Sequence, residues 1–172
     1  MTTHMFMTRK SNRSRGFTLV ELMVVISIIG LLSSVILASL NITRYRAYDS
    51  RRFSDLRNVE SAINAYFADN GVYPTTGSAW QSVCGSPFTV TAQNVVVPSI
   101  VAGKYIASIP VGPQMVAASL YDCYVYKSNG TDYKFMDYGP TYVGGKTPSG
   151  TLNDPGRSGA AWAVYSPGAS TW

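Results

Sequence analysis

The stretch from Phe17 to Leu40 constrains this chain more than any other feature. Its only charged side chain is Glu21. A helix of this length rises about 36 Å, which is enough to cross the hydrocarbon core of a bilayer. Four basic residues and no acid precede the stretch: Arg9, Lys10, Arg13 and Arg15. Because basic flanks stay in the cytoplasm, the sequence predicts a single-pass segment whose C-terminal part is exported.

Glu21 is the anomaly within this stretch. A carboxylate inside an apolar span costs roughly 2.5–3.5 kcal/mol on insertion scales, and such a group usually has a partner. No cation lies between Phe17 and Leu40 to pair with it. The sequence therefore predicts a partner on another molecule, or a new terminal amine made by cleavage just before Phe17.

The block from Arg15 to Leu22, Arg-Gly-Phe-Thr-Leu-Val-Glu-Leu, resembles the signal of type IV pilins and type II secretion pseudopilins. The likeness lies in a basic leader ending in Gly16, followed by Phe17 and by Glu21 at the fifth position. The resemblance implies that a prepilin peptidase cleaves between Gly16 and Phe17 and N-methylates Phe17. It also implies that Glu21 meets the amine of a neighbouring subunit during filament assembly.

Three other interpretations of the stretch compete with this one. A secretory signal peptide has a shorter apolar region and a small-residue cleavage site after it. A plain signal anchor fits the length but leaves Glu21 unexplained. A buried helix of a soluble protein is disfavoured because the segment is apolar nearly all round.

Residues 41–70 continue the helix in a different pattern. Apolar residues recur at spacings of mostly three or four, no proline occurs between Phe17 and Asp69, and Asn70-Gly71 is a helix stop. The sequence thus predicts a leader (1–16), an apolar half-helix (17–40), an amphipathic half-helix (41–70) and a loop-rich domain (71–172). The segment after the helix, Asp69 to Pro74, also resembles pilins and pseudopilins, although many relatives carry a proline in the apolar half.

The exported part favours an α+β fold with a small antiparallel sheet on the outer half of the helix. Two strand-like runs, 121–126 and 133–138, flank Asn129-Gly130, which is a strong hairpin signal. In the second run, Tyr133 and Phe135 should face the opposite side from Met136. A last strand is expected at 161–166. Weaker signals suggest a short helix at 78–84 and strands at 88–90 and 95–97.

Two cysteines, Cys84 and Cys123, lie in the exported part, where disulfides persist. We expect one bridge, worth about 3–4 kcal/mol in the chain-entropy model, with two free thiols as the alternative. No cofactor is expected. A Ca²⁺ ion near Asp154, with Asp137 and Asp122 as further acids, is the alternative to an ordinary turn, but calcium needs more oxygens than these supply.

The sequence offers little for catalysis or nucleic-acid binding. The single histidine, His4, lies in the leader, so the mature chain has no histidine for a triad or a metal site. The net charge of +5 falls to +1 without residues 1–16, which hold four basic residues and no acid. The basic character therefore belongs to the leader, and no specific nucleic acid is inferred as a partner.

We therefore expect a structural subunit and not an enzyme. The resemblance implies a homo-oligomeric filament, a prepilin peptidase, and an inner-membrane assembly platform with its ATPase. The chain would wait in the inner membrane and then enter a cell-surface or periplasmic filament. A type IV pilin is slightly preferred to a G-like type II secretion pseudopilin, because no acid-rich calcium loop is evident. An uncleaved, membrane-anchored binding domain or enzyme is the alternative from another class.

Overall fold

The structure is a computed structural model that describes residues 16–115, 120–139, 152–157 and 160–172. The predicted leader falls outside these ranges except for Gly16, and the side chains at 35 and 37–39 are also not described. The chain divides into two units, 1–40 and 41–172.

The predicted long helix is confirmed as α1, Leu19–Asn70. It begins two residues after Phe17 and ends at the predicted stop, where Gly71 takes a φ of 72° and donates its N–H to the Phe67 carbonyl at 2.8 Å. Glycine adopts this left-handed conformation without a steric penalty, which is why the helix ends there.

In the first unit, the described side chains between Phe17 and Leu40 are exposed, and most of them are large and apolar. Within the described part of the chain, no helix is both long enough and apolar enough to cross a membrane.

The second unit carries a sheet of five strands in the order β2-β1-β3-β4-β5. Their bounds are Gln81–Ser82, Thr89–Val90, Cys123–Ser128, Tyr133–Tyr138 and Ala161–Tyr165 for β1 to β5. The fold is α+β, as expected. The sheet is mixed, because β1 and β2 pair in parallel while the other neighbours are antiparallel. The parallel pair is only two residues long and lies at one edge.

The predicted hairpin is confirmed as β3 and β4, joined by residues 129–132. Side chains of the hairpin alternate between two cores. Tyr126 and Phe135 lie in the larger core, and Val125 and Met136 lie in the smaller one. Both faces of the hairpin are therefore buried. This explains why apolar residues occur at both the odd and the even positions of its strands.

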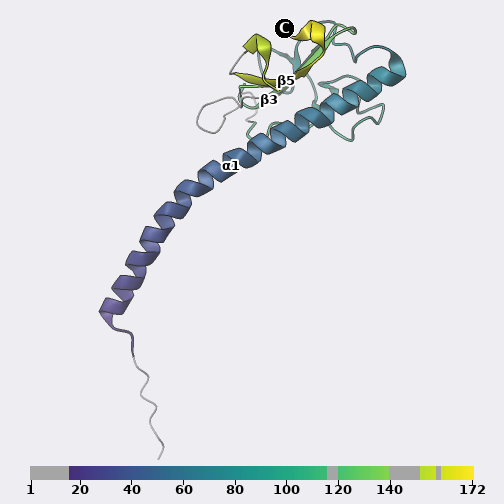
Figure 1. The fold of residues 1–172 in the computed structure, drawn as a ribbon. Coiled ribbons are helices and arrows are strands. Elements are labelled where there is room, and N and C mark those ends of the chain that lie inside the picture. The colour runs from purple at the N-terminus through teal and green to yellow at the C-terminus, as the bar shows by residue number, and fades with distance from the viewer. Residues whose placement is uncertain (1–15, 116–119, 140–151, 158–159) are drawn as a thin grey trace, which may run out of the picture. The chain divides into compact units, whose positions relative to one another are not determined.

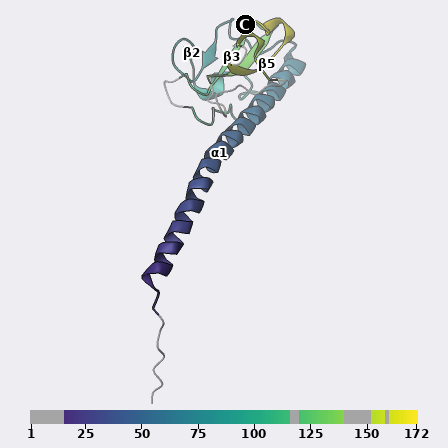
Figure 2. The ribbon, with the colours of Figure 1, turned by 60° about the vertical axis from the view of Figure 1, so that its left-hand side comes forward.

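The larger core joins the sheet to the C-terminal half of α1, and the two lie side by side in both ribbon views (Figures 1 and 2). Leu56, Val59 and Ile63 are fully buried there. Their spacing of three and four residues puts them on one face of the helix. The amphipathic pattern of residues 41–70 thus arises because one face covers the sheet.

Two of the weaker predictions are wrong. Residues 78–84 form no helix, because Gly77 and Ser78 both have positive φ angles and Gln81–Ser82 then pairs with β3 as β1. Residues 95–97 form no strand. Gln93–Val95 is a 3-10 turn (η1), and Val96 and Val97 are buried in the larger core without a strand partner. The apolar run there signalled burial and not strand pairing.

Candidate processing and assembly site

The residues of the predicted processing site lie just ahead of α1. Gly16, Phe17 and Thr18 have no regular secondary structure, and the Phe17 side chain is 84% exposed. Glu21 lies in the first turn of α1 and is also exposed. The structure therefore brings the expected cleavage position, the expected methylated residue and the acid together on one accessible helix end.

Glu21 has a partner within its own chain. Its Oε2 accepts the Thr18 N–H at 2.9 Å and the Thr18 hydroxyl at 2.7 Å, and its own N–H donates to Thr18 Oγ1 at 3.2 Å. This reciprocal arrangement is a capping box, which satisfies free donors at a helix N-terminus. This partner was not predicted from the sequence, although Thr-x-x-Glu ahead of an apolar run is the signature of a capping box.

Cys84 and Cys123 form a disulfide in the structure, with their Cα atoms 6.3 Å apart. The bridge lies in the smaller core and joins the segment after β1 to the start of β3. Ser82 Oγ lies 2.7 Å from Cys123 Sγ and accepts the Cys84 N–H at 3.0 Å. The disulfide therefore links the segment that follows β1 to β3, the central strand of the sheet.

The acids considered for calcium are held by cationic side chains. Asp154 Oδ1 accepts from Lys134 Nζ at 2.8 Å, and Asp154 Oδ2 accepts from Arg157 at 3.2 Å. Asp122 and Asp137 lie around the guanidinium of Arg52, on a different element. Among the described residues, no group of three His, Cys, Asp or Glu side chains is placed to hold a metal ion.

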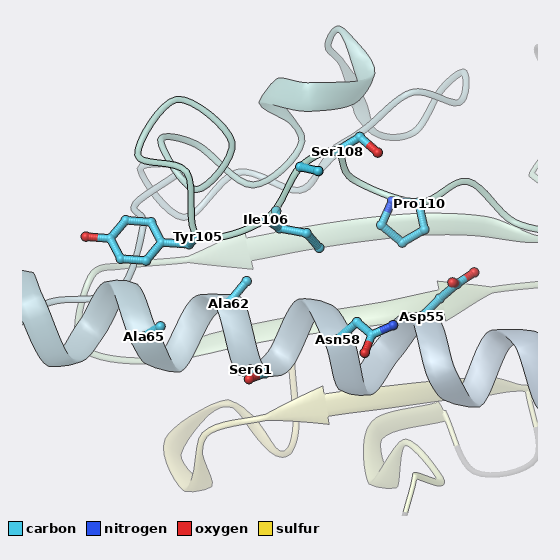
Figure 3. Close-up of a pocket in the computed structure, with 10 residues that line it drawn as sticks. Asp55, Asn58, Ser61, Ala62, Ala65, Tyr105, Ile106, Ser108 and Pro110 are labelled. Atoms are coloured by element: carbon cyan, nitrogen blue, oxygen red, sulfur yellow. The ribbon is translucent and has the colours of Figure 1, made fainter.

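A groove of about 500 Å³ runs between the C-terminal half of α1 and the segment 105–110. Figure 3 shows Asn58, Ser61 and Ala62 on the helix side of this groove. At one end, Asp55 accepts the Tyr124 hydroxyl at 2.9 Å, and burial raises the pKa of both groups. Among the described residues that line the groove, no nucleophile is paired with a base.

The sequence matches a family model near its N-terminus and several known proteins over longer stretches. The family model described as the prokaryotic N-terminal methylation motif matches residues 11–37. The type II secretion system core protein G of Escherichia coli (strain K12) is 39% identical over 79 residues, which cover 46% of this chain and 54% of the relative. The chain thus spans about half the length of this relative.

Longer matches extend into the second unit. The type II secretion system core protein G of Pectobacterium carotovorum subsp. carotovorum is 33% identical over 127 residues, or 74% of this chain and 69% of the relative. The type IV major pilin protein PilE of Neisseria gonorrhoeae is 29% identical over 113 residues, or 66% of this chain and 60% of the relative. No solved structure matches the chain.

Proposed function

We propose, from the premise that the chain belongs to the pilin and pseudopilin family, that it is a structural subunit of a pilus-like filament. Proteins of this family are structural and not enzymatic. The observation that carries the proposal is the 33% identity over 127 residues to a type II secretion core protein G, because that match continues beyond the N-terminal helix. A shared signal alone would not reach the domain that follows it.

Within the family, we propose a subunit of a type II secretion filament as the first candidate. The match to the Escherichia coli core protein G reaches 39% identity, whereas the match to the type IV pilin PilE reaches 29%. The sequence alone slightly favoured a type IV pilin. The type IV pilin becomes the second candidate and is retained because the PilE match covers 66% of the chain.

Processing is proposed to remove residues 1–16 and to leave a methylated Phe17 as the new N-terminus. The support is the motif match over residues 11–37 and the exposure of Phe17 ahead of α1. A peptidase needs an extended, accessible backbone, and Gly16 and Phe17 on either side of the cleavage position lie outside α1. The methylated amine would then lie beside the first turn, which carries Glu21.

Glu21 is proposed to act in assembly by exchanging partners. In the single chain its carboxylate is satisfied by Thr18, which lowers the cost of leaving it in apolar surroundings. An arriving terminal amine offers a full positive charge, which forms a stronger, charge-assisted contact than a hydroxyl or amide does. The capping box would hold the carboxylate in place until that amine arrives.

Before assembly, the chain is proposed to wait in the inner membrane with its second unit exported. The support is the single charge between Phe17 and Leu40, the basic residues before it and the family membership. Assembly would use a prepilin peptidase and a membrane platform with its ATPase. An apolar helix gains nothing from the hydrophobic effect on leaving lipid, so extraction needs an external energy source.

The decisive experiment is mass spectrometry of the intact protein, expressed with and without a prepilin peptidase. We expect a chain that begins at N-methylated Phe17 only when the peptidase is present. Filaments built from chains that keep residues 1–16 would contradict the proposal. An intact N-terminus without filaments would instead favour an exported, membrane-anchored binding domain or enzyme.

A second experiment separates the two candidate filaments. The gene is introduced into one strain lacking its secretion core protein G and into another lacking its major pilin. Restored secretion with no surface pili supports the first candidate, and restored pili without secretion supports the second. In either strain, Glu21→Gln should insert normally and assemble poorly, whereas a Glu60→Gln control in the second unit should assemble normally.

A further inference from the structure

Arg52 lies fully buried on α1 at the centre of a charged cluster in the second unit. Its Nε donates to Asp122 Oδ1 at 2.6 Å and lies 3.1 Å from Asp137 Oδ2. Its Nη1 donates to Asp49 at 2.7 Å and its Nη2 to the Gln114 side chain at 3.0 Å. The Arg52 guanidinium therefore links α1 to Asp137 on β4, to Asp122 just before β3, and to Gln114 in the segment that precedes Asp122.

The two buried acids do not share this arginine equally. The Nε atom carries one hydrogen, and the shorter contact to Asp122 takes it. Asp122 also accepts the Gln114 backbone N–H. Within the described part of the chain, neither side-chain oxygen of Asp137 has a hydrogen-bond partner, although Asp137 is fully buried. A buried carboxylate that accepts no hydrogen bond is costly, so these surroundings disfavour the ionised form of Asp137.

A proton on Asp137 removes this cost. The neutral acid has an O–H group, which can donate to the Asp122 carboxylate beside it. The pair would then carry one negative charge against the one positive charge of Arg52. Two ionised carboxylates at this arginine would instead repel each other without water to screen them, and Asp49 at the rim would add a third.

Among the described residues, no donor forms a hydrogen bond with either Asp137 oxygen. The Tyr124 hydroxyl, on β3, donates to Asp55 on α1, so it is committed elsewhere. Asp55 is also an acid and pairs with Arg51 at 3.6 Å. Burial chiefly, and the Asp122 carboxylate next, hold the pKa of Asp137 well above its usual range, against the opposing pull of Arg52.

We propose that Asp137 carries a proton in the folded protein at neutral pH, and that Arg52, Asp122 and Asp137 form a proton-dependent lock between α1 and the sheet. The lock is strongest in mild acid and weakens as rising pH removes the proton. This role goes beyond filament assembly, does not depend on the proposed function, and gives the exported unit a response to the pH around it.

The sign of the effect follows from proton counting. In the unfolded chain Asp137 is ionised above about pH 4, whereas in the folded chain it keeps its proton. The folded state therefore binds one proton more, and its stability falls as pH rises. The folded-to-unfolded ratio changes by up to about tenfold per pH unit in this window. The effect ends once the pH passes the raised pKa of the folded state.

The test compares the full chain with its Asp137→Asn variant, in detergent micelles, by denaturant unfolding between about pH 5 and about pH 8. The amide is neutral and close in shape, so it keeps the uncharged state at every pH. We expect the variant to gain stability relative to the wild type as pH rises. The control, Asp69→Asn, removes an exposed acid outside the cluster and should show no such trend.

A variant that gains no stability relative to the wild type as pH rises would overturn the proposal. If Asp137 were ionised and held by Arg52, the variant would be the less stable chain throughout, and the difference would not change between about pH 5 and about pH 8. Infrared spectroscopy gives a second reading that does not need the variant to fold well. The wild type at neutral pH should show the carbonyl band of a buried, protonated carboxyl group, and its absence would refute the lock.

Discussion

Lys134→Met is the sharpest test of how the second unit is held together. Lys134 is fully buried on β4, and its Nζ donates to Asp154 at 2.8 Å, to the Ser170 carbonyl at 3.0 Å and to the Trp172 carbonyl at 3.1 Å. Its cross-strand neighbour on β3 is Lys127. The two lysines point to the same face of the sheet, yet only Lys134 is enclosed.

The cost of the substitution follows from what it leaves behind. Breaking a buried ion pair by removing one partner costs about 3–5 kcal/mol, because the other charge stays buried. Asp154 would keep Arg157 at 3.2 Å and the Gly156 N–H at 3.0 Å. The lower end of the range, about 3 kcal/mol, is therefore expected. That is a large share of the stability of a small domain.

The assay is urea unfolding of the full chain in detergent micelles, followed by the fluorescence of the buried Trp162. Lys127→Met is the matched control. The Lys127 Nζ lies over the rings of Trp80 and Trp172, 5.5 Å and 4.7 Å from their centroids. A partly exposed contact of this kind is worth about 0.5–1 kcal/mol, so the loss of both contacts should cost the control at most about 2 kcal/mol.

A double variant completes the test. Lys134→Met combined with Asp154→Asn removes both charges and should recover part of the loss, because no buried charge is left unpaired. Equal losses for Lys134→Met and Lys127→Met would refute the reasoning. So would a double variant less stable than the sum of its two single variants.

Three further predictions concern other parts of the chain. Replacing Cys84 and Cys123 by serine should cost about 4 kcal/mol, from the loop that the bridge closes, measured as the shift in the urea midpoint. Thr18→Val should cost about 1 kcal/mol at the start of α1, seen as faster amide exchange in its first turn, with Thr18→Ser as the retaining control. Gly112→Ala should lower the melting temperature, because its Cβ would overlap the carbonyl oxygen of the residue before β3; an unchanged melting temperature would contradict this close approach.

The parts of the fold that could be predicted are those determined by residues close together in the sequence. The helix stop at Asn70 and the hairpin around Gly130 are local signals, and both are where the sequence places them. The capping box of Thr18 and Glu21 is an equally local signal, but the charge of Glu21 in an apolar stretch indicated an external partner instead. An unusual acid near a helix start can therefore be a cap.

The buried charges could not be predicted in the same way. Arg52 and Asp122 are 70 positions apart, and nothing near either residue marks the other as its partner. In sequence, Arg52 lies in the amphipathic half of the helix among other charged residues and reads as a solvent-facing side chain. Only the packing of α1 on the sheet turns it inward, so this contact is a property of the tertiary fold.

The two-sided burial of the β3–β4 hairpin limits how this domain can meet a neighbour. Both surfaces of its central strands are already covered by the protein itself. Within the described residues, the contacts that this domain itself makes with a neighbour must then come from its rims: the turns, the short outermost strand β2 and the bare side of the helix. Such rims can change from one relative to another without disturbing the interior, which leaves the domain free to diversify where it touches others.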